Sequence, residues 1–172
     1  MQDPTTKRRI IGIDPGSRFT GFGIIEKSGN KLALLHAGRI AVPKGELHAR
    51  LYLIFQGLSD IIAQHRPTEA AVEGLFHHRN ADSALKLGQA RGAALVACAH
   101  HHLSVAEYAP THVKQAVVGT GRADKDQVQK MVKLILSMDA TALALDASDA
   151  LALAICHAQH HQGIDALRRR TP

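Results

Sequence analysis

The chain has 172 residues and 45% of them are hydrophobic, which suits one domain with a buried core and argues against disorder. Lysine and arginine outnumber aspartate and glutamate by 21 to 15, and the resulting net charge of +6 favours a polyanionic partner such as nucleic acid. Aromatic residues make up only 3%, which argues against a module that reads single strands with rows of stacked rings.

The sequence carries no signal of export or of membrane insertion. No apolar run reaches the length of a membrane span, and no signal-peptide apolar region follows the basic residues Lys7, Arg8 and Arg9. Cys98 and Cys156 lie within helical apolar patterns without a CxxC spacing, so they predict buried thiols and not a disulfide. We expect a cytoplasmic protein that does not associate with membranes.

The stretch Ile10–Ser17 combines a buried strand with a sharp turn. Its three isoleucines favour an interior strand, while Pro15 cannot donate to a ladder and Gly16 tolerates a positive φ. Asp14 is therefore predicted at the exposed end of a strand that is otherwise buried, where a carboxylate is costly unless a cation uses it. On this stretch alone an aspartate that only starts a turn is an equal alternative.

Hydrophobic periodicity and turn signals predict the remaining elements. Strands are expected over residues 19–26, 31–42, 69–73 and 103–108, with turns at Pro15-Gly16 and at Ser28-Gly29-Asn30. Two long helices are expected over residues 47–62 and 80–101. A short helix is expected to start at Pro110-Thr111 with Thr111 as its N-cap, and the next to be capped by Asp124, with Gln127 at the capping-box position. A last helix is expected to begin near Asp146.

This order predicts an α/β fold with a mixed five-stranded sheet. Three strands form an antiparallel meander, and the other two return through helical crossovers, so helices must cover both faces. We expect a flexible basic leader at residues 1–8, a single domain over residues 9–162 and a basic C-terminal tail at residues 163–172.

Four acids lie where predicted elements begin or end: Asp14, Glu73, Asp146 and Asp149. If the first and fourth strands are neighbours, their two acids project from adjacent strand ends, and the other two share one face of a helix's first turn. Each acid also has an ordinary interpretation, because Asp146 and Asp149 suit a helix N-terminus and Glu73 suits an ion pair with an arginine.

The joint pattern favours a metal centre. Carboxylates that converge repel one another unless a hard divalent cation lies between them, and an all-oxygen set of ligands favours Mg²⁺ or Mn²⁺ over Zn²⁺. Two such ions, roughly 4 Å apart, activate water and stabilise the leaving oxygen of a phosphodiester. An acidic centre on a basic chain fits a polyanionic substrate that is cut with the help of metal ions.

The helix predicted over residues 80–101 has a face of small residues at Ala81, Ala84, Gly88 and Gly92. Two glycines inside a helix cost roughly 1 kcal/mol each relative to alanine, so a compensating close approach of another helix is expected. Tight packing within one subunit and contact with a second copy are both possible explanations at this point.

Several motifs together resemble the RuvC type of Holliday-junction resolvase over roughly residues 9–162. They are Ile13-Asp14-Pro15-Gly16-Ser17, Val72-Glu73 with Phe76 close behind, residues 80–92, residues 113–119 and residues 146–152. The resemblance implies a ribonuclease-H-like fold, a homodimer, and nicking of two like-polarity strands of a four-way DNA junction in recombination and repair. It also implies Mg²⁺ as cofactor, replaceable by Mn²⁺ and bound as two ions, and a branch-migration complex of the RuvA and RuvB type as partner.

The resemblance assigns roles to particular residues. Asp14, Glu73, Asp146 and Asp149 align with the family's metal-binding acids, Lys114 and Lys125 with its basic residues at the scissile phosphate, and Phe76 with its base-stacking aromatic. The face formed by Ala81, Ala84, Gly88 and Gly92 matches the family's dimer interface. Further DNA contacts are expected from Arg79, Lys86, Arg91 and Arg122.

Other functions compete with this interpretation. An actin-like or sugar-kinase-type ATPase uses a similar strand-to-aspartate start but needs two such subdomains. A junction clamp without catalysis and a related nuclease acting on RNA are the other rivals. The histidines at residues 100–102 and at 157, 160 and 161 suggest a metal site only weakly, since consecutive histidines at a helix end are more often solvated.

Overall fold

The computed structural model describes residues 7–74, 80–139 and 142–168, with side chains described as far as residue 160. The strands are β1 (Arg8–Asp14), β2 (Phe19–Ser28), β3 (Lys31–Ala41), β4 (Glu69–Glu73) and β5 (Ser104–Tyr108). The helices are α1 (Leu47–His65), α2 (Ala81–His100), α3 (Pro110–Val118), α4 (Lys125–Ile135) and α5 (Leu145–Arg168).

The five strands form one mixed sheet in the order β3-β2-β1-β4-β5. β1, β2 and β3 pair antiparallel, whereas β4 pairs parallel with β1 and β5 parallel with β4. The predicted fold class is therefore confirmed. β1 lies in the middle of the sheet, and its neighbour on the parallel side is the strand that ends in Glu73.

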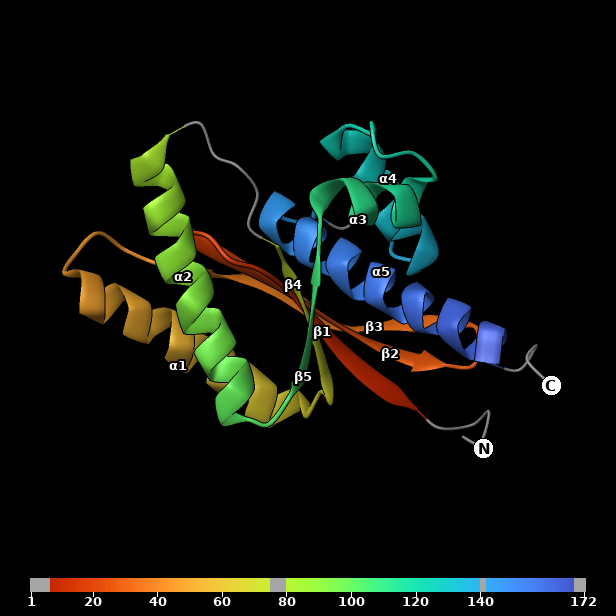
Figure 1. Cartoon of the computed structure of the whole chain (residues 1–172), viewed down its shortest axis with the longest axis horizontal. Coiled ribbons are helices and arrows are strands. Elements are labelled where there is room, and N and C mark those ends of the chain that lie inside the picture. The colour runs from red at the N-terminus through yellow and green to blue at the C-terminus, as the bar shows by residue number, and fades with distance from the viewer. Residues whose placement is uncertain (1–6, 75–79, 140–141, 169–172) are drawn as a thin grey trace.

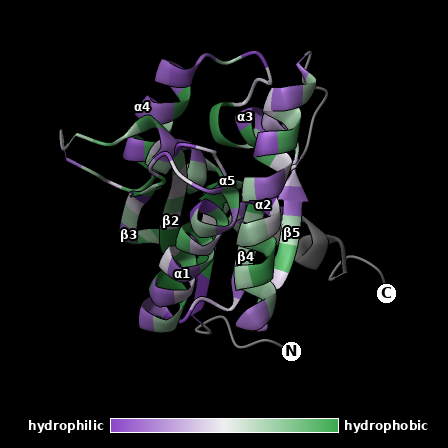
Figure 2. Cartoon of the chain, turned by 90° about the vertical axis from the view of Figure 1, so that its left-hand side faces the viewer, coloured by the Kyte–Doolittle hydropathy of each residue, from purple (hydrophilic) through white to green (hydrophobic). Residues whose placement is uncertain are grey.

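Helices cover both faces of the sheet, as predicted. α1 and α2 lie on one face, and α5 with α3 and α4 lies on the other (Figure 1). Successive isoleucines of β1 serve both layers, since Ile10 packs in the core under α5 while Ile11 and Ile13 pack in the core under α1 and α2. Hydrophobic residues concentrate on the strands and the inner sides of the helices (Figure 2). A strand buried on both faces gives Asp14 a rigid base.

The predicted turns and caps are mostly present. Gly29 takes a positive φ of 57° between β2 and β3, and Asp124 forms the expected capping box with Gln127. The prediction for Thr111 was wrong, because α3 begins at Pro110 and its N-cap is Ala109, without a side-chain cap. Proline suits the first position of a helix because its φ is fixed near the helical value. The helix therefore begins at Pro110, whereas with Thr111 as the N-cap it would have begun at His112.

Gly16 is required for space. Its φ is not among the positive values, and a Cβ there would lie 2.2 Å from the carbonyl oxygen of Phe19. At the other end of the chain α5 continues to Arg168, beyond the boundary expected at residue 162. Both cysteines are free and buried. In the described part of the chain no helix is long and apolar enough to cross a membrane.

Candidate active site

Asp14 and Glu73 end two neighbouring parallel strands. In the register of β1 and β4, Ile13 is paired with Val72, and each acid is the next residue on its strand. Both carboxylates therefore emerge side by side at the same edge of the sheet, as expected if the two strands are neighbours. The turn at Pro15 and Gly16 then leads the chain away to β2.

α5 reaches these strand ends because glycines let it lie directly on the sheet. A Cβ at Gly12 would lie 1.8 Å from the carbonyl oxygen of Ala150, and one at Gly21 would lie 2.0 Å from that of Asp146. Gly21 is the β2 partner of Asp14, so the contact fixes the start of α5 against the residue beside Asp14. The interlocked main chains place Asp146 and Asp149 near the strand ends.

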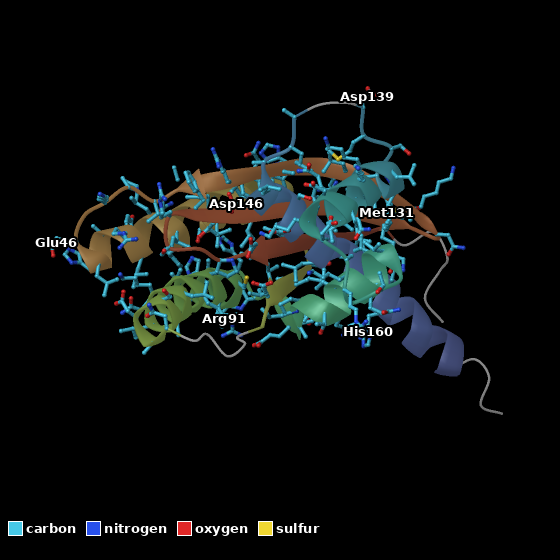
Figure 3. All side chains as sticks on the ribbon, turned by 90° about the horizontal axis from the view of Figure 1, so that it is seen from above. Glu46, Arg91, Met131, Asp139, Asp146 and His160 are labelled. Atoms are coloured by element: carbon cyan, nitrogen blue, oxygen red, sulfur yellow. The ribbon has the colours of Figure 1, made fainter. Side chains whose placement is uncertain are left out.

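Each helix acid faces a cation. Nζ of Lys125 lies 3.1 Å from Oδ2 of Asp149, and a guanidinium nitrogen of Arg39 lies 3.6 Å from Oδ2 of Asp146. The Arg39 guanidinium also stacks 4.1 Å from the centre of the Phe19 ring. Asp146 lies near the middle of the molecule, while Glu46 lies at one end (Figure 3).

A cavity of about 290 Å³ opens over three of the four acids. It is lined by Asp14, Glu73, Pro110, Val113, Lys114, Lys125, Val128, Asp149, Ala152 and Leu153. One wall is thus acidic and carried by β1, β4 and α5, whereas the two lysines come from α3 and α4. The structure brings five of the six expected catalytic residues into one cavity. The sixth, Asp146, does not line the cavity, but its charge raises the pKa of Asp14.

Asp14 is the electrostatic centre of the cluster. Burial raises the pKa of Asp14 most, Glu73, Asp149 and Asp146 raise it further, and Lys125 lowers it, giving a value of about 8. A carboxyl group in this position holds its proton at neutral pH unless a cation stabilises the charged form. Binding of a divalent ion here must therefore release a proton.

The chemistry of the ligand set fits a hard divalent ion, because all four candidate ligands are carboxylates. Within the described residues no group of three or more His, Cys, Asp and Glu side chains is arranged to hold a metal ion. The acids instead pair with local cations, as Asp149 does with Lys125 and Asp146 with Arg39. These two cations balance the charge of Asp146 and Asp149, and a bound metal ion would take over that role.

The expected DNA-binding residues lie in different surroundings. Lys114 and Lys125 line the cavity. Arg122, shortly before Lys125 in the sequence, is exposed. Arg91 is largely buried, donates from Nε to the carbonyl oxygen of Glu73 at 3.2 Å and pairs with Glu107. This geometry makes Arg91 a support for the end of β4. Phe76 and Arg79 lie outside the described residues.

The small-residue face of α2 is open within the chain. A Cβ at Gly88 or Gly92 would meet no atom of the described residues within 4 Å, so packing against that part of the subunit does not explain these glycines. Leu85 and Val96 extend the same face and are 61% and 58% exposed. Ala81 is exposed and Ala84 partly exposed on it. The face is therefore apolar, close to the helix backbone and uncovered by the described residues.

Arg39, Gly12 and Gly21 complete the site and were not identified from the sequence. Gly12 and Gly21 lie inside strands, where a glycine signals a close approach of another main chain. That signal was present, but it does not say which element approaches. Arg39 carries no such signal, because its pairing with Asp146 depends on where the third strand of the meander lies.

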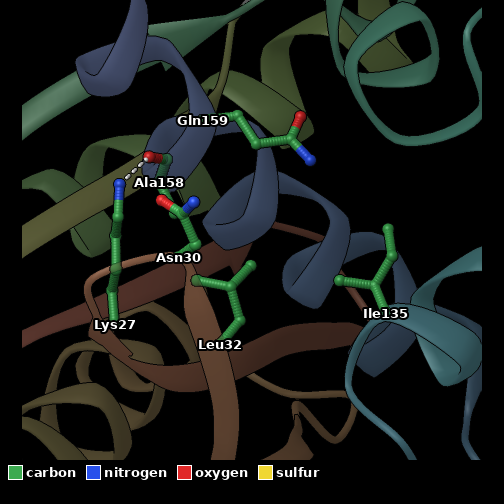
Figure 4. Close-up of a pocket in the computed structure, with 6 residues that line it drawn as sticks. All are labelled: Lys27, Asn30, Leu32, Ile135, Ala158 and Gln159. Carbon is green, nitrogen blue, oxygen red and sulfur yellow. Dashed lines mark hydrogen bonds between the residues drawn. The ribbon is translucent and has the colours of Figure 1, made fainter.

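Another cavity, of about 340 Å³, lies away from the acids. Lys27, Asn30, Leu32, Ile135, Ala158 and Gln159 line it (Figure 4). The ammonium group of Lys27 donates to the carbonyl oxygen of Ala158 at 2.7 Å and so ties β2 to α5. None of the described lining residues is a carboxylate, so they offer no group of the kind that the acidic site provides.

The histidines do not form a metal site within the described residues. His157 is only 2% exposed, and its two ring nitrogens lie 2.7 Å from the Tyr108 hydroxyl and 2.9 Å from Oε2 of Glu69. His157 is therefore not a solvated histidine. It connects α5 to β4 and β5 inside the fold.

Sequence comparison agrees with this geometry. The family model for crossover junction endodeoxyribonuclease RuvC matches residues 10–157. A protein of that name from Halorhodospira halophila is 56% identical over 153 residues, covering 88% of this chain and 90% of that protein. Another from Citrifermentans bemidjiense is 58% identical over 159 residues, covering 92% and 96%.

Structural comparison gives the same answer. The structure of Thermus thermophilus RuvC in complex with a Holliday junction substrate matches with a TM-score of 0.85 and 34% identity, covering 91% of this chain and 96% of that one. The yeast mitochondrial Holliday junction resolvase Ydc2 shares the fold, with a TM-score of 0.71 at 9% identity over 94% of this chain and 84% of that one. The chain thus belongs to the RuvC family of Holliday-junction resolvases, the crossover junction endodeoxyribonucleases, with their ribonuclease-H-like fold.

Proposed function

We propose that this protein resolves four-way DNA junctions by paired, symmetric, metal-dependent nicks in strands of like polarity, during recombination and repair. The observation that carries the proposal is the group of acids from β1, β4 and α5 that faces Lys114 and Lys125 across one cavity. The net charge of +6 supports a polyanionic substrate around this acidic centre.

Asp14, Glu73, Asp146 and Asp149 are the residues that would hold Mg²⁺, with Mn²⁺ as a substitute and two ions per site. Bound there, the ions supply an activated water and stabilise the leaving oxygen of the phosphodiester. Asp14 releases its proton when the ions bind, since its pKa is about 8. The fit rests on four oxygen ligands projecting from rigid elements.

Lys114 and Lys125 hold the scissile phosphate from the other side of the cavity. Lys125 is also poised beside Asp149, at 3.1 Å, so the same ammonium group balances the acids before the substrate arrives. Arg91 keeps the end of β4 in place through the carbonyl group of Glu73. The side chains of this chain thus position the phosphate, while base stacking is proposed for Phe76.

A homodimer is part of the proposal. Two symmetric cuts need two active centres related by a two-fold axis, and the uncovered face of α2 at Ala81, Ala84, Gly88 and Gly92 is suited to a self-complementary contact. The proposal also includes a cytoplasmic location and a branch-migration complex of the RuvA and RuvB type as partner, because the substrate would be a junction in chromosomal DNA.

The test is a cleavage assay on a synthetic four-way junction, with each strand labelled in turn and a linear duplex of the same sequence as control. We expect Mg²⁺-dependent nicks at symmetric positions in two opposite strands and no cutting of the duplex. Asp14→Asn should abolish the nicks while the protein still binds the junction. Equal cutting of the duplex, or wild-type cutting by the variant, would refute the proposal.

A further inference from the structure

A third hollow, of about 650 Å³, begins just past the turn that follows Asp14. Its walls come from the turn between β1 and β2, the end of β3, α1 and α2, and its lining residues include Ser17, Phe19 and Pro43. Phe19 carries the Arg39 guanidinium on its ring, and Arg39 in turn pairs with Asp146. The hollow is thus linked to the acidic site through two side chains.

Of the residues that the structure describes, four cations and no acid line this hollow. The cations are Arg18, Lys44, Arg50 and Lys86. Arg18 and Lys44 are exposed and form no salt bridge with any residue in the described part of the chain. Lys86 pairs with Asp82 one helical turn away, but both side chains are more than half exposed, so solvent screens that pair. The excess of positive charge points to an anionic ligand.

Arg50 provides an independent observation. One terminal nitrogen of its guanidinium donates to the carbonyl oxygen of Ser17 at 2.5 Å, which fixes the arginine against the turn after Asp14. Its Nε is buried and has no acceptor among the described residues. No carboxylate pairs with this guanidinium among the described residues, so its positive charge adds to that of the hollow.

The shape and composition of the hollow favour a phosphate backbone over a nucleotide or a stacked single strand. A stacked base needs a free aromatic face, and Arg39 covers the ring of Phe19, the aromatic residue in the lining. Arginine and lysine side chains spread over four elements instead suit successive phosphates, which fix the position of a duplex without reading its sequence.

We propose that Arg18, Lys44, Arg50 and Lys86 form a phosphate-binding groove for a duplex arm of the junction on the β3 and α1 side of the active site. This groove rests on the proposed function, because it takes a part of the same substrate. It extends the DNA contact surface away from Lys114 and Lys125, which approach the cavity from α3 and α4. Glu46, labelled at one end of the molecule in Figure 3, lies next to the groove in sequence but does not line it.

The experiment compares two double variants with the same loss of charge. Arg18→Gln with Lys44→Gln removes the two exposed cations of the groove, and Lys31→Gln with Lys130→Gln removes two exposed lysines elsewhere. Equilibrium binding to a four-way junction is measured by fluorescence anisotropy over a range of salt concentrations. The melting temperatures of both variants are measured first, because exposed side chains should leave the fold intact.

The groove variant should bind on the order of tenfold more weakly at low salt, and its salt slope should fall by about 1.8, at roughly 0.9 for each lost phosphate contact. The control variant should keep the slope of the wild type. If the wild type binds and cuts junctions while both variants share its slope, the groove is refuted and the proposed function stands. If the wild type itself does not bind junctions, the proposed function fails instead.

Discussion

Nζ of Lys125 lies 3.1 Å from Oδ2 of Asp149, so the first residue of α4 is tied to α5 near its start. This hydrogen bond and the charge of Asp149 raise the pKa of Lys125, burial lowers it, and Asp14 and Asp146 raise it further. The lysine in turn lowers the pKa of Asp14. One ammonium group therefore couples three acids of the site before any substrate or ion is present.

Replacing Lys125 should affect cutting more than folding. If Lys125 contacts the scissile phosphate as proposed, Lys125→Gln removes a charged donor from the place where negative charge develops, and the loss of such a donor costs about 10²- to 10³-fold in rate. The measurement is the single-turnover cutting rate of a four-way junction at saturating enzyme. Lys130→Gln, on the exposed side of the same helix, is the matched control. Equal cutting rates for the two variants would show that Lys125 has no role in the reaction.

Asp14 should make the metal-free protein less stable as pH rises. Burial first, and then Glu73, Asp149 and Asp146, raise its pKa from 3.8 to about 8. Between these values the folded chain holds a proton that the unfolded chain has released, so the free energy of unfolding falls with increasing pH. Asparagine cannot ionise, and the stability of Asp14→Asn relative to the wild type should rise by about 1.4 kcal/mol per pH unit over this interval.

Denaturant titrations in EDTA at several pH values between 4 and 8 measure this difference. Addition of Mg²⁺ should stabilise the wild type increasingly with pH, because binding competes with the proton on Asp14. The variant should not respond. A stability difference that stays constant across this range would contradict the assignment of the raised pKa to Asp14.

Gly21 should be needed for both stability and cutting. A Cβ at this position would lie 2.0 Å from the main-chain oxygen of Asp146, which neither β2 nor α5 can avoid without moving. Overpacking of this kind costs about 1–3 kcal/mol, and the shift would carry Asp146 away from Asp14. We expect Gly21→Ala to unfold at lower denaturant and to cut at least about tenfold more slowly, since small misplacements at a reacting centre have large effects.

The control for this variant is Gly45→Ala, since a Cβ at Gly45 meets nothing within 4 Å. Its stability should change by less than about 0.5 kcal/mol. A harmless Gly21→Ala would mean that α5 is not fixed by contact with the sheet at this glycine.

The sequence predicted the parts of the site that depend on local pattern. Asp14 and Glu73 follow apolar strand segments, and the adjacency of β1 and β4 then aligns them in register. Asp146 and Asp149 lie one turn apart at the start of a helix, so their shared face is also a local property. For these residues the fold needed only to bring three element ends together.

The remaining features depend on contacts between distant segments. The approach of α5 to Gly12 and Gly21 is an encounter of two main chains, and no periodicity in either segment encodes its partner. The buried position of His157 was not predicted, for a related reason. α5 is buried on nearly all sides over residues 147–158. Its sequence therefore shows no contrast between a polar face and an apolar face, and such a contrast is what would have placed His157 on the buried side.

The α2 face should hold two copies of the chain together. Leu85 is 61% exposed beside the open glycines, so Leu85→Glu would place a charge in the proposed contact. We expect this variant to be a monomer at micromolar concentration by sedimentation and to lose paired cutting. Leu134 on α4 is 71% exposed, and Leu134→Glu should remain a dimer. If the wild type is a monomer, or both variants are dimers, the contact lies elsewhere.

Glu69 should stabilise the fold through its ionised form. Burial raises its pKa, but hydrogen bonds from His157 and Arg8 and their charges outweigh burial and lower it from 4.5 to about 2. A carboxyl group with a lowered pKa contributes stability that is present above its ordinary value and lost as the pH falls towards the lowered one. Glu69→Gln should therefore cost about 1.5–3 kcal/mol at pH 6, the range for hydrogen bonds to charged groups.

The cost of Glu69→Gln should shrink as the pH falls from 4.5 towards 2, because the wild-type carboxyl group then also becomes neutral. Tyr108→Phe is the internal comparison. Its hydroxyl lies 2.7 Å from Nδ1 of His157, and burial, with Cys156 and Glu69, raises its pKa to about 12. Since this phenol does not ionise in acid, its removal should cost about 1 kcal/mol at both ends of the range. Urea titrations of both variants across this range would separate the two behaviours, and a pH-independent cost for Glu69→Gln would show that charge is not what this carboxylate contributes.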